Sequence, residues 1–346
     1  GALCALGAAW QAKYHRMAAL IMLGGAGLVT CITFLWFSAP DLALTQLVVE
    51  IVTTILILLG LRWLPRRDQT LAPLTAQSNY RTRMRRIRDF LIAVSAGLGC
   101  AWLAFAMMSR PFPESTSTFF LEKALPEGGG TNVVNVMLVD FRGFDTFGEI
   151  VVLGIVALTI YALLRRFRPA RETMDLPEQQ RFLAGDLQTD LLNPRNAQDT
   201  AIGYLMVPAV LVRLLLPFAT MVAVYIFLRG HNEPGGGFVA GLVFSVALLL
   251  QYIVSGTQWV EAHLPLFPRR WIGVGLLLAV ATGLGSIAVG YPFLTSHSFH
   301  WTLPVLGEVH LASATFFDLG VFALVVGATL LILTALAHQS VRAHRY

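Results

Sequence analysis

Apolar runs about as long as a bilayer-spanning helix recur along the whole chain, separated by short segments that collect most of the arginines. A helix rises about 1.5 Å per residue, so a run of about 20 residues crosses the hydrocarbon core of a membrane. Hydrophobic residues make up 56% of the chain and charged residues only 13%, which excludes an ordinary soluble domain. The pattern predicts an all-α, polytopic transmembrane helical bundle of about eight spanning helices.

The distribution of charge predicts the orientation of these helices. The formal net charge is +5, and the arginines gather at 62–88, 165–168, 269–270 and 342–345. Assigning each of these segments to the cytoplasm gives a consistent up-and-down path, as the positive-inside rule requires. Topology and contact with anionic lipid explain these clusters better than binding to RNA, so we expect the lipid bilayer and no nucleic acid as a partner.

A polar segment with mixed charges divides the apolar runs into two sets of four. It predicts a membrane module at 1–168, a cytoplasmic linker at 169–202 and a second membrane module at 203–346. The apolar segment 131–142 is too short to span and predicts a short re-entrant or interfacial helix, or a broken helix packed within protein. The chain begins inside an apolar run, and we interpret it as a fragment or as a chain from which an earlier part has been removed.

The predicted helix over 39–61 carries an acid near its middle. Glu50 shares a helical face with Gln46 and two threonines, so the carboxylate lies in a polar stripe rather than on a lipid face. An ionised side chain at this depth costs about 3 kcal/mol or more, which favours a protonatable or cation-binding site over a structural hydrogen bond. Asp41, in the first turn, is either a helix cap or part of the same ion path.

Four more charged residues fall within VDFRGFDTFGEI: Asp140, Arg142, Asp145 and Glu149. Thr146 with Glu149 three residues later fits a capping box, and Asp145 is an alternative cap. Asp140 beside Arg142 in an apolar segment predicts a neutralised pair that a passing cation or proton disturbs. The cap and the ion-handling site remain alternatives for these residues.

The second half contributes three further candidates. HNEPGGGF at 231–238 predicts a tight turn between two helices, because no strand precedes it and no GK[ST] follows as in a phosphate loop. Asp318, inside the last predicted helix, serves either an interhelical hydrogen bond or a proton relay. The histidines of the last outer loop lack a rigid helical spacing, so a solvated role is favoured over a metal site; they are His297, His300 and His310.

Motifs of enzymes and of resident cofactors are not found. The chain has no nucleophile elbow, paired metal motif or phosphate loop, and its histidines sit at or beyond the ends of the predicted helices. Its three cysteines stand alone in apolar runs, without the spacing of a zinc or haem site. We therefore expect a protein that is not an enzyme and that needs no cofactor.

Four strings resemble a known family, the Mrp-type multisubunit Na⁺/H⁺ antiporter. APDLALTQLVVEIVTT and GGGTNVVNVMLVDFRGFDTFGEIVVL resemble the carboxy-terminal region of its A-type subunit, and LLLPFATMVAVYIFLRGHNEPGGGFVAGLV and GEVHLASATFFDLGVFALVVG resemble its B-type subunit. The resemblance implies a fusion of the two. It departs from the family in one respect, since the long antiporter-like region of the A-type subunit is absent and neither lysine lies inside a predicted helix.

The resemblance implies a membrane subunit that exports Na⁺, and K⁺ or Li⁺ as alternatives, in exchange for H⁺ in the bacterial plasma (inner) membrane, with other antiporter subunits as partners. By position, the membrane carboxylates of the family map to Asp41, Glu50, Asp140, Asp145 and Glu149, and Na⁺ would bind transiently at Glu50 and Asp140. Two alternatives stay open. The chain is an assembly scaffold without its own ion path, or a subunit of a redox-driven pump such as a membrane-bound hydrogenase.

Overall fold

Eight helices in the described residues are long and apolar enough to cross a membrane, which confirms the predicted bundle. The computed structural model describes residues 1–12, 15–61, 63–64, 80–111, 115–167, 206–303 and 307–343, with the backbone alone at 206–209, 258, 298–303, 307–311 and 340–343. The eight are α2 (Arg16–Trp36), α3 (Pro40–Leu61), α4 (Tyr80–Met108), α7 (Gly143–Arg166), α10 (Met206–Arg229), α11 (Gly237–Ser255), α13 (Pro268–Ala288) and α14 (Ala314–Ala343). The predicted linker at 169–202 lies outside the described residues.

The remaining elements are short. They are α1 (Ala2–Gln11), α5 (Ser117–Lys123), α6 (Val133–Val136), the π-helical turn η1 (Met137–Phe141), α12 (Thr257–His263) and the strands β1 (Ser298–Leu303) and β2 (Gly307–Ala312). The two strands form an antiparallel hairpin in which Ser298 pairs with Ala312 and Leu303 with Gly307. This hairpin was not predicted, and the last helix, α14, begins after it at Ala314.

The chain forms two compact units. One is Arg66–Phe119, which contains α4, and the other combines Gly1–Pro65 with Phe120–Tyr346. Helix α4 begins at Tyr80, so it includes arginines of the segment 62–88 as well as the apolar run that follows. No residue of α4 is buried.

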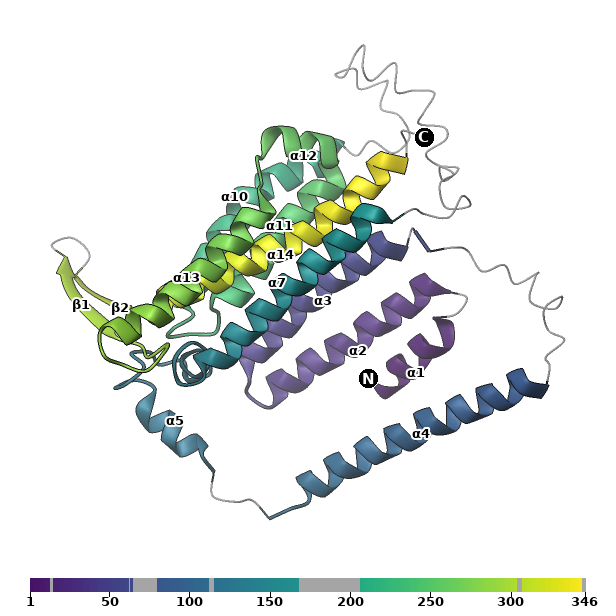
Figure 1. Ribbon diagram of the computed structural model, residues 1–346, viewed down its shortest axis with the longest axis horizontal. Helices are drawn as coiled ribbons and strands as arrows, with labels where there is room; N and C mark the ends of the chain where they lie inside the picture. Colours follow the sequence, from purple (N-terminus) through teal and green to yellow (C-terminus); the bar gives the residue numbers. More distant parts are fainter. Residues whose placement is uncertain are drawn as a thin grey trace, which may run out of the picture. The chain divides into compact units, whose positions relative to one another are not determined.

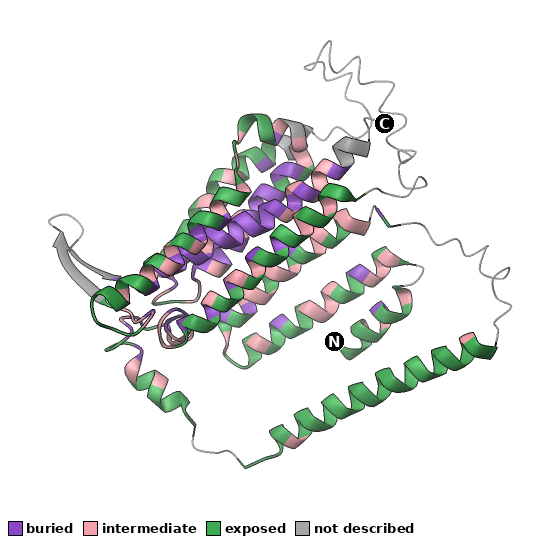
Figure 2. Ribbon diagram, in the orientation of Figure 1, coloured by how far each residue is buried: buried purple, intermediate pink, exposed green. Residues whose placement is uncertain are grey.

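Helices α11 and α14 form the centre of the larger unit. Figure 1 shows α14 alongside α11, α13 and α7, and Figure 2 shows burial concentrated on α11 and α14. Two glycines let α13 and α14 pack backbone to backbone, since a Cβ atom at Gly275 would lie 2.6 Å from the carbonyl oxygen of Gly320. Such close packing of small residues is how helices associate in membranes, where lipid tails are as apolar as leucine.

Helix α3 contacts helices of both predicted modules. It packs against α2 on one side, where the Cys31 thiol donates to the carbonyl oxygen of Ala43, and against α11 on another, where Val48 and Val52 are buried in the core. Helix α7 packs against α14 in the same unit. The two predicted modules therefore share one core, while their boundaries at 168 and 203 remain a prediction.

The short apolar segment is a broken helix. One turn of α-helix, α6, continues into the π-helical turn η1, and α7 begins two residues later at Gly143. The Thr146 hydroxyl donates to the carbonyl oxygen of Leu138 at 2.7 Å, and no side chain caps the start of α7. The predicted capping box of Thr146 and Glu149 is therefore wrong, because η1 supplies the acceptor for that hydroxyl. Whether the segment is re-entrant or interfacial remains a prediction.

Candidate functional site

The glycine loop, residues 230–237, joins α10 to α11 in the tight turn that the sequence predicts. Gly236 has φ of +106°, a left-handed conformation that side chains disfavour. A Cβ atom at Gly230 would lie 2.2 Å from the backbone nitrogen of Gly236, so the two ends of the loop touch. Arg229 closes the turn by donating to the carbonyl oxygen of Pro234 and pairing with Glu233.

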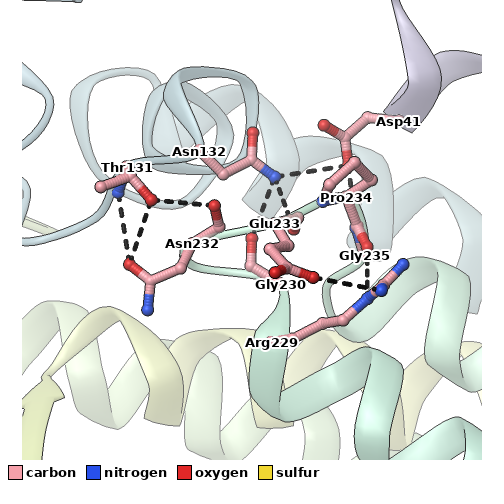
Figure 3. A network of polar contacts seen from close by, with 9 residues as sticks. All are labelled: Asp41, Thr131, Asn132, Arg229, Gly230, Asn232, Glu233, Pro234 and Gly235. Carbon is pink, nitrogen blue, oxygen red and sulfur yellow. Dashed lines mark hydrogen bonds and ion pairs between the residues drawn. The ribbon is translucent and has the colours of Figure 1, made fainter.

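Asp41 binds this loop from the first turn of α3. Its Oδ1 atom accepts a hydrogen bond from the backbone nitrogen of Gly235 at 2.9 Å and a longer one from Asn132 Nδ2 at 3.4 Å (Figure 3). The residue is only 9% exposed. The sequence predicted that Asp41 is a helix cap or part of an ion path. Neither role includes this hydrogen bond to a residue 194 positions away.

The segment that precedes α6 holds the other side of the loop. Asn132 Nδ2 donates to the carbonyl oxygens of Gly230 and Glu233 at 3.0 and 2.9 Å (Figure 3). The Oδ1 atom of Asn132 accepts from the Asn135 backbone nitrogen. Thr131 adds hydrogen bonds to Asn232, and the Asn132 backbone nitrogen donates to the carbonyl oxygen of His231. Backbone groups of the loop thus serve as the hydrogen-bond partners that water would otherwise provide to a cluster of buried polar groups.

Asp318 receives the end of the loop. Its Oδ2 atom accepts a hydrogen bond from the backbone nitrogen of Gly237 at 2.7 Å. Gly237 is the first residue of α11, so a carboxylate on α14 satisfies one of the free N–H groups at the start of another helix. Of the two roles predicted for Asp318, the structure shows the interhelical hydrogen bond.

Asp140 lies near the end of η1 and contacts the loop after α13. Its Oδ1 atom accepts from the backbone nitrogen of Ser296 at 2.9 Å. Burial raises the pKa of Asp140, and the hydrogen bond from Ser296 and the nearby His231 partly offset that rise. The environment therefore favours the protonated acid more than water does.

The predicted pair of Asp140 and Arg142 is replaced by another. Arg142 forms an ion pair with Asp145, three residues further on, and both side chains are exposed. Glu149 is also exposed on α7. The turn at η1 directs Asp140 inward and these three residues outward, so the ten-residue cluster does not form one site.

Glu50 lies on α3, away from the glycine loop. Its carboxylate is half-buried against α2, with Oε1 3.7 Å from the position of a Cβ atom at Gly24. The only hydrogen bond to it among the described residues comes from Gln46 Nε2 at 3.5 Å, the limit of a useful contact. Thr53, assigned to the same polar stripe, is exposed and donates to the carbonyl oxygen of Val49.

No described group of three or more histidine, cysteine, aspartate or glutamate side chains could hold a metal ion. His297 exchanges hydrogen bonds with Ser313 through its backbone. His300 and His310 are paired in the hairpin register, but their side chains lie outside the described residues. Glu50 and Asp140, the proposed Na⁺ ligands, sit on different elements with different neighbours.

Three family models match the chain. They are MnhB, "Domain related to MnhB subunit of Na+/H+ antiporter", at residues 207–331, and two components of MBH, MbhD at 1–66 and MbhE at 84–181. The B-type subunit of a Na⁺/H⁺ antiporter from Bacillus subtilis is 46% identical over 115 residues, which are 33% of this chain and 80% of that protein. The chain belongs to the multisubunit Na⁺/H⁺ antiporter family.

Two further relatives are a fused subunit and an A-type subunit. A probable K⁺/H⁺ antiporter A/B subunit from Rhizobium meliloti is 58% identical over all 346 residues, which make up 34% of that protein. The A-type subunit of the Na⁺/H⁺ antiporter of Bacillus subtilis is 41% identical over 150 residues, 43% of this chain and 18% of that protein. The chain thus combines part of an A-type subunit with a B-type subunit, and spans about a third of the fused relative.

A solved antiporter assembly has the same fold. The Mrp complex from Dietzia sp. contains a chain that is 29% identical, with a TM-score of 0.73 over 93% of this chain and 32% of that one. The eight apolar helices among the described residues, together with these relatives, show that this member of the family is a multi-pass membrane protein.

Asp41 and Asp318 differ from Glu50 in how they are held. Asp41 and Asp318 are each held by a backbone N–H of the glycine loop, so they join α3 and α14 through that loop. Glu50 has only one weak hydrogen bond among the described residues, which leaves its oxygens available to a proton or a cation. The site therefore consists of a structural joint at one end of α3 and one accessible acid in its middle.

Sequence reasoning missed the residues that build the joint. Asn132 and Asn135 are buried, and both lie in an apolar segment where an amide side chain must find a partner. The need of a buried amide for a hydrogen-bond partner was the available signal. The partners of the Asn132 amide, however, are backbone groups of residues about a hundred positions away. No side-chain motif marks such acceptors.

Proposed function

We propose that the chain is a membrane subunit of a monovalent cation/proton antiporter that exports Na⁺ or K⁺ in exchange for H⁺. The observation that carries the proposal is the 58% identity, over the full chain, to a relative named as a K⁺/H⁺ antiporter A/B subunit. The relatives from Bacillus subtilis are named as Na⁺/H⁺ antiporter subunits. Exchange of a monovalent cation for a proton is common to both names.

Glu50 is the residue proposed to meet the ion. A carboxylate in the middle of a spanning helix alternates between a protonated form, favoured by desolvation, and an ionised form stabilised by a cation. Among the described residues, the Glu50 carboxylate accepts only one weak hydrogen bond, and this supports an ion-binding role better than a structural one. Each elementary charge that crosses 100 mV is worth about 2.3 kcal/mol, so the membrane potential drives export if more protons enter than cations leave.

Two other functions have weaker support. A scaffold without its own ion path would use the glycine-loop joint but would not need the under-bonded acid Glu50. A redox-driven pump is favoured by the MBH models at 1–66 and 84–181, yet the relatives of higher identity are named as antiporter subunits.

The proposed setting follows from the charges. The chain would lie in the bacterial plasma membrane together with the other subunits of the complex, with the arginines at the end of α7 and the start of α13 on the cytoplasmic side. Accessibility of single cysteines, introduced beside Arg166 and Arg270, to an impermeant thiol reagent would test this orientation. Labelling in intact cells would contradict it.

The decisive experiment measures antiport by the complete complex. Everted membrane vesicles that contain it are energised, and Na⁺ or K⁺ is added while a fluorescent probe reports the pH gradient. We expect Glu50→Gln to abolish cation-dependent proton movement while the complex remains intact on a native gel. Full activity of that variant would remove Glu50 from the mechanism, and loss of assembly would favour the scaffold.

The same vesicles distinguish the cations. If the protein resembles the Rhizobium relative in selectivity, K⁺ dissipates the gradient at lower concentration than Na⁺, and the reverse order would favour Na⁺ export. No response to either cation with wild-type complex would contradict the proposed function as a whole.

A further inference from the structure

Glu50 faces a helix surface that lacks side chains. Helix α2 carries glycines at 24 and 27, three residues apart, so both lie on one face. A Cβ atom built at Gly27 would lie 2.2 Å from Glu50 Oε2 and 2.5 Å from its Cδ atom. Real Cβ contacts essentially never fall below 3.0 Å, so the carboxylate occupies the volume that a side chain at 27 would need.

Few other contacts hold the carboxylate in this position. Among the described residues, only Gln46 donates a hydrogen bond to it, and at 3.5 Å this bond is weak. Steric fit against the backbone of α2 therefore decides where the acid lies. If the carboxylate left this space, it would turn toward lipid or toward the threonines further along α3, where an ionised group is costly.

We propose that Gly27 is a positioning residue for Glu50. Its missing side chain leaves the space in which the carboxylate lies against α2, and this fixes the point at which a proton or a dehydrated cation meets the acid. The proposal rests on the proposed function, because it assigns Gly27 a role only through Glu50.

The chain supplies matched controls. A Cβ atom at Gly24 would lie 3.7 Å from Glu50 Oε1, an ordinary contact, and one at Gly60, on the same helix as Glu50, would meet nothing within 4 Å. All three positions are in spanning helices, so changing each to alanine alters helix propensity in the same way. Only Gly27→Ala collides with the acid.

Antiport by the complete complex is the first measurement. We expect Gly27→Ala to lower cation-dependent proton movement at least about tenfold, because small displacements of a reacting group are expensive. Gly24→Ala and Gly60→Ala should stay within about twofold of wild type. Full activity of Gly27→Ala would overturn the proposal, as would equal losses in all three variants.

Shortening the acid distinguishes a positioning role of Gly27 from a role in helix packing. Glu50→Asp shortens the acid by one methylene group and withdraws it from α2, so Gly27→Ala should cause little further loss of activity in the Glu50→Asp background. If Gly27→Ala alone fails to assemble, restored assembly of the double variant on a native gel still shows that the conflict is with Glu50. An equal defect in both backgrounds would show a packing role only and overturn the proposal.

A hydrophobic carbodiimide gives a readout that does not depend on transport. The protonated acid adds its O–H across one C=N bond of the reagent, and the resulting O-acylisourea rearranges to a stable N-acylurea without any change in oxidation state. We expect the pH dependence of labelling at residue 50, and its protection by Na⁺ or K⁺, to shift in Gly27→Ala and to stay unchanged in Gly24→Ala. An unchanged profile in Gly27→Ala would contradict the proposal.

The two proposals fail separately. If Glu50→Gln transports normally, the role of Glu50 in the proposed function is wrong whatever Gly27→Ala does. If Glu50→Gln is inactive and Gly27→Ala behaves like the control glycines, the proposed function stands and the positioning role of Gly27 is wrong.

Discussion

Three acids in apolar helices have similar sequence surroundings but different partners. The sequence located Asp41, Glu50 and Asp318 and showed that each needs a polar neighbour. It did not show that two of them bind backbone amides of one glycine loop, because every residue type except proline supplies such a donor. The helical face of Glu50 identified Gln46 as a neighbour but not the glycines of the adjacent helix, and the role of Glu50 on an ion path stays a prediction.

Asn132 is predicted to be the most sensitive polar residue of the joint. Asn132→Ala leaves two carbonyl oxygens of the loop without their side-chain donor, at a cost of about 1–3 kcal/mol for each buried group left unsatisfied. The thermal midpoint of the purified complex should fall. Thr131→Val, at an exposed position of the same network, is the control and should have a smaller effect. Equal midpoints for Asn132→Ala and wild type would contradict the role of the amide.

Asp140 predicts a pH dependence of stability. Because burial raises its pKa in the folded protein above the ordinary value of 3.8, its contribution to stability is fully present below that value and is lost as the pH rises through the folded pKa. Asp140→Asn keeps an acceptor for Ser296 but does not ionise. The variant should therefore gain stability relative to wild type as the pH rises from acid to neutral, as measured by thermal unfolding. The absence of this trend in Asp140→Asn would refute the assignment.

Helix α3 places its two acids on opposite sides. Nine residues separate Asp41 from Glu50, which at about 100° per residue is two and a half turns. One acid therefore faces the glycine loop and the other faces α2. Apolar runs predicted this helix and its seven companions well, because length and hydropathy suffice for a spanning segment. The hairpin of β1 and β2 was not predicted, although SFHWTL in β1 and EVHL in β2 alternate polar and apolar residues.

Alanine is expected to destabilise the protein by different amounts at two glycines that have similar backbone conformations. Gly236 and Gly256 both combine a positive φ with an extended ψ, so alanine at either position is strained by about 1–3 kcal/mol. Only at Gly236 would the added Cβ atom also meet a neighbour, 2.6 Å from Asn135 Nδ2. Gly236→Ala should lower the thermal midpoint of the complex more than Gly256→Ala does. Equal shifts would show that the loop tolerates a side chain facing Asn135.

At the scale of the molecule, the two predicted modules are joined by packing and by polar contacts. Helix α3 packs on α11 and α7 on α14, and the glycine loop adds hydrogen bonds from Asp41 and Asn132. The sequence predicted two sets of spanning helices from the polar segment between them. The sequence did not predict that the two sets share a core, because hydropathy shows which segments enter a membrane and not which of them are in contact.

The shared core predicts that the halves hold together without a covalent link. When residues 1–185 and 186–346 are expressed as two polypeptides with different tags, we expect them to co-purify, as the two matching relatives in Bacillus subtilis are separate proteins. Asp41→Ala combined with Asn132→Ala should reduce the yield of the pair. Recovery of each half alone from the unmutated pair would contradict the packed joint.

The π-helical turn η1 holds one residue more than an α-helical turn would, and its effect resembles an insertion that the helix has absorbed. Loss of a single residue there, for example Leu138, would rotate everything upstream by about 100° relative to α7. Asn132 and Asn135 would then swing away from the loop while α7 kept its place beside α14. Insertions and deletions of one codon in this short stretch should therefore be far more damaging than most substitutions within it, so its length is constrained more tightly than its composition.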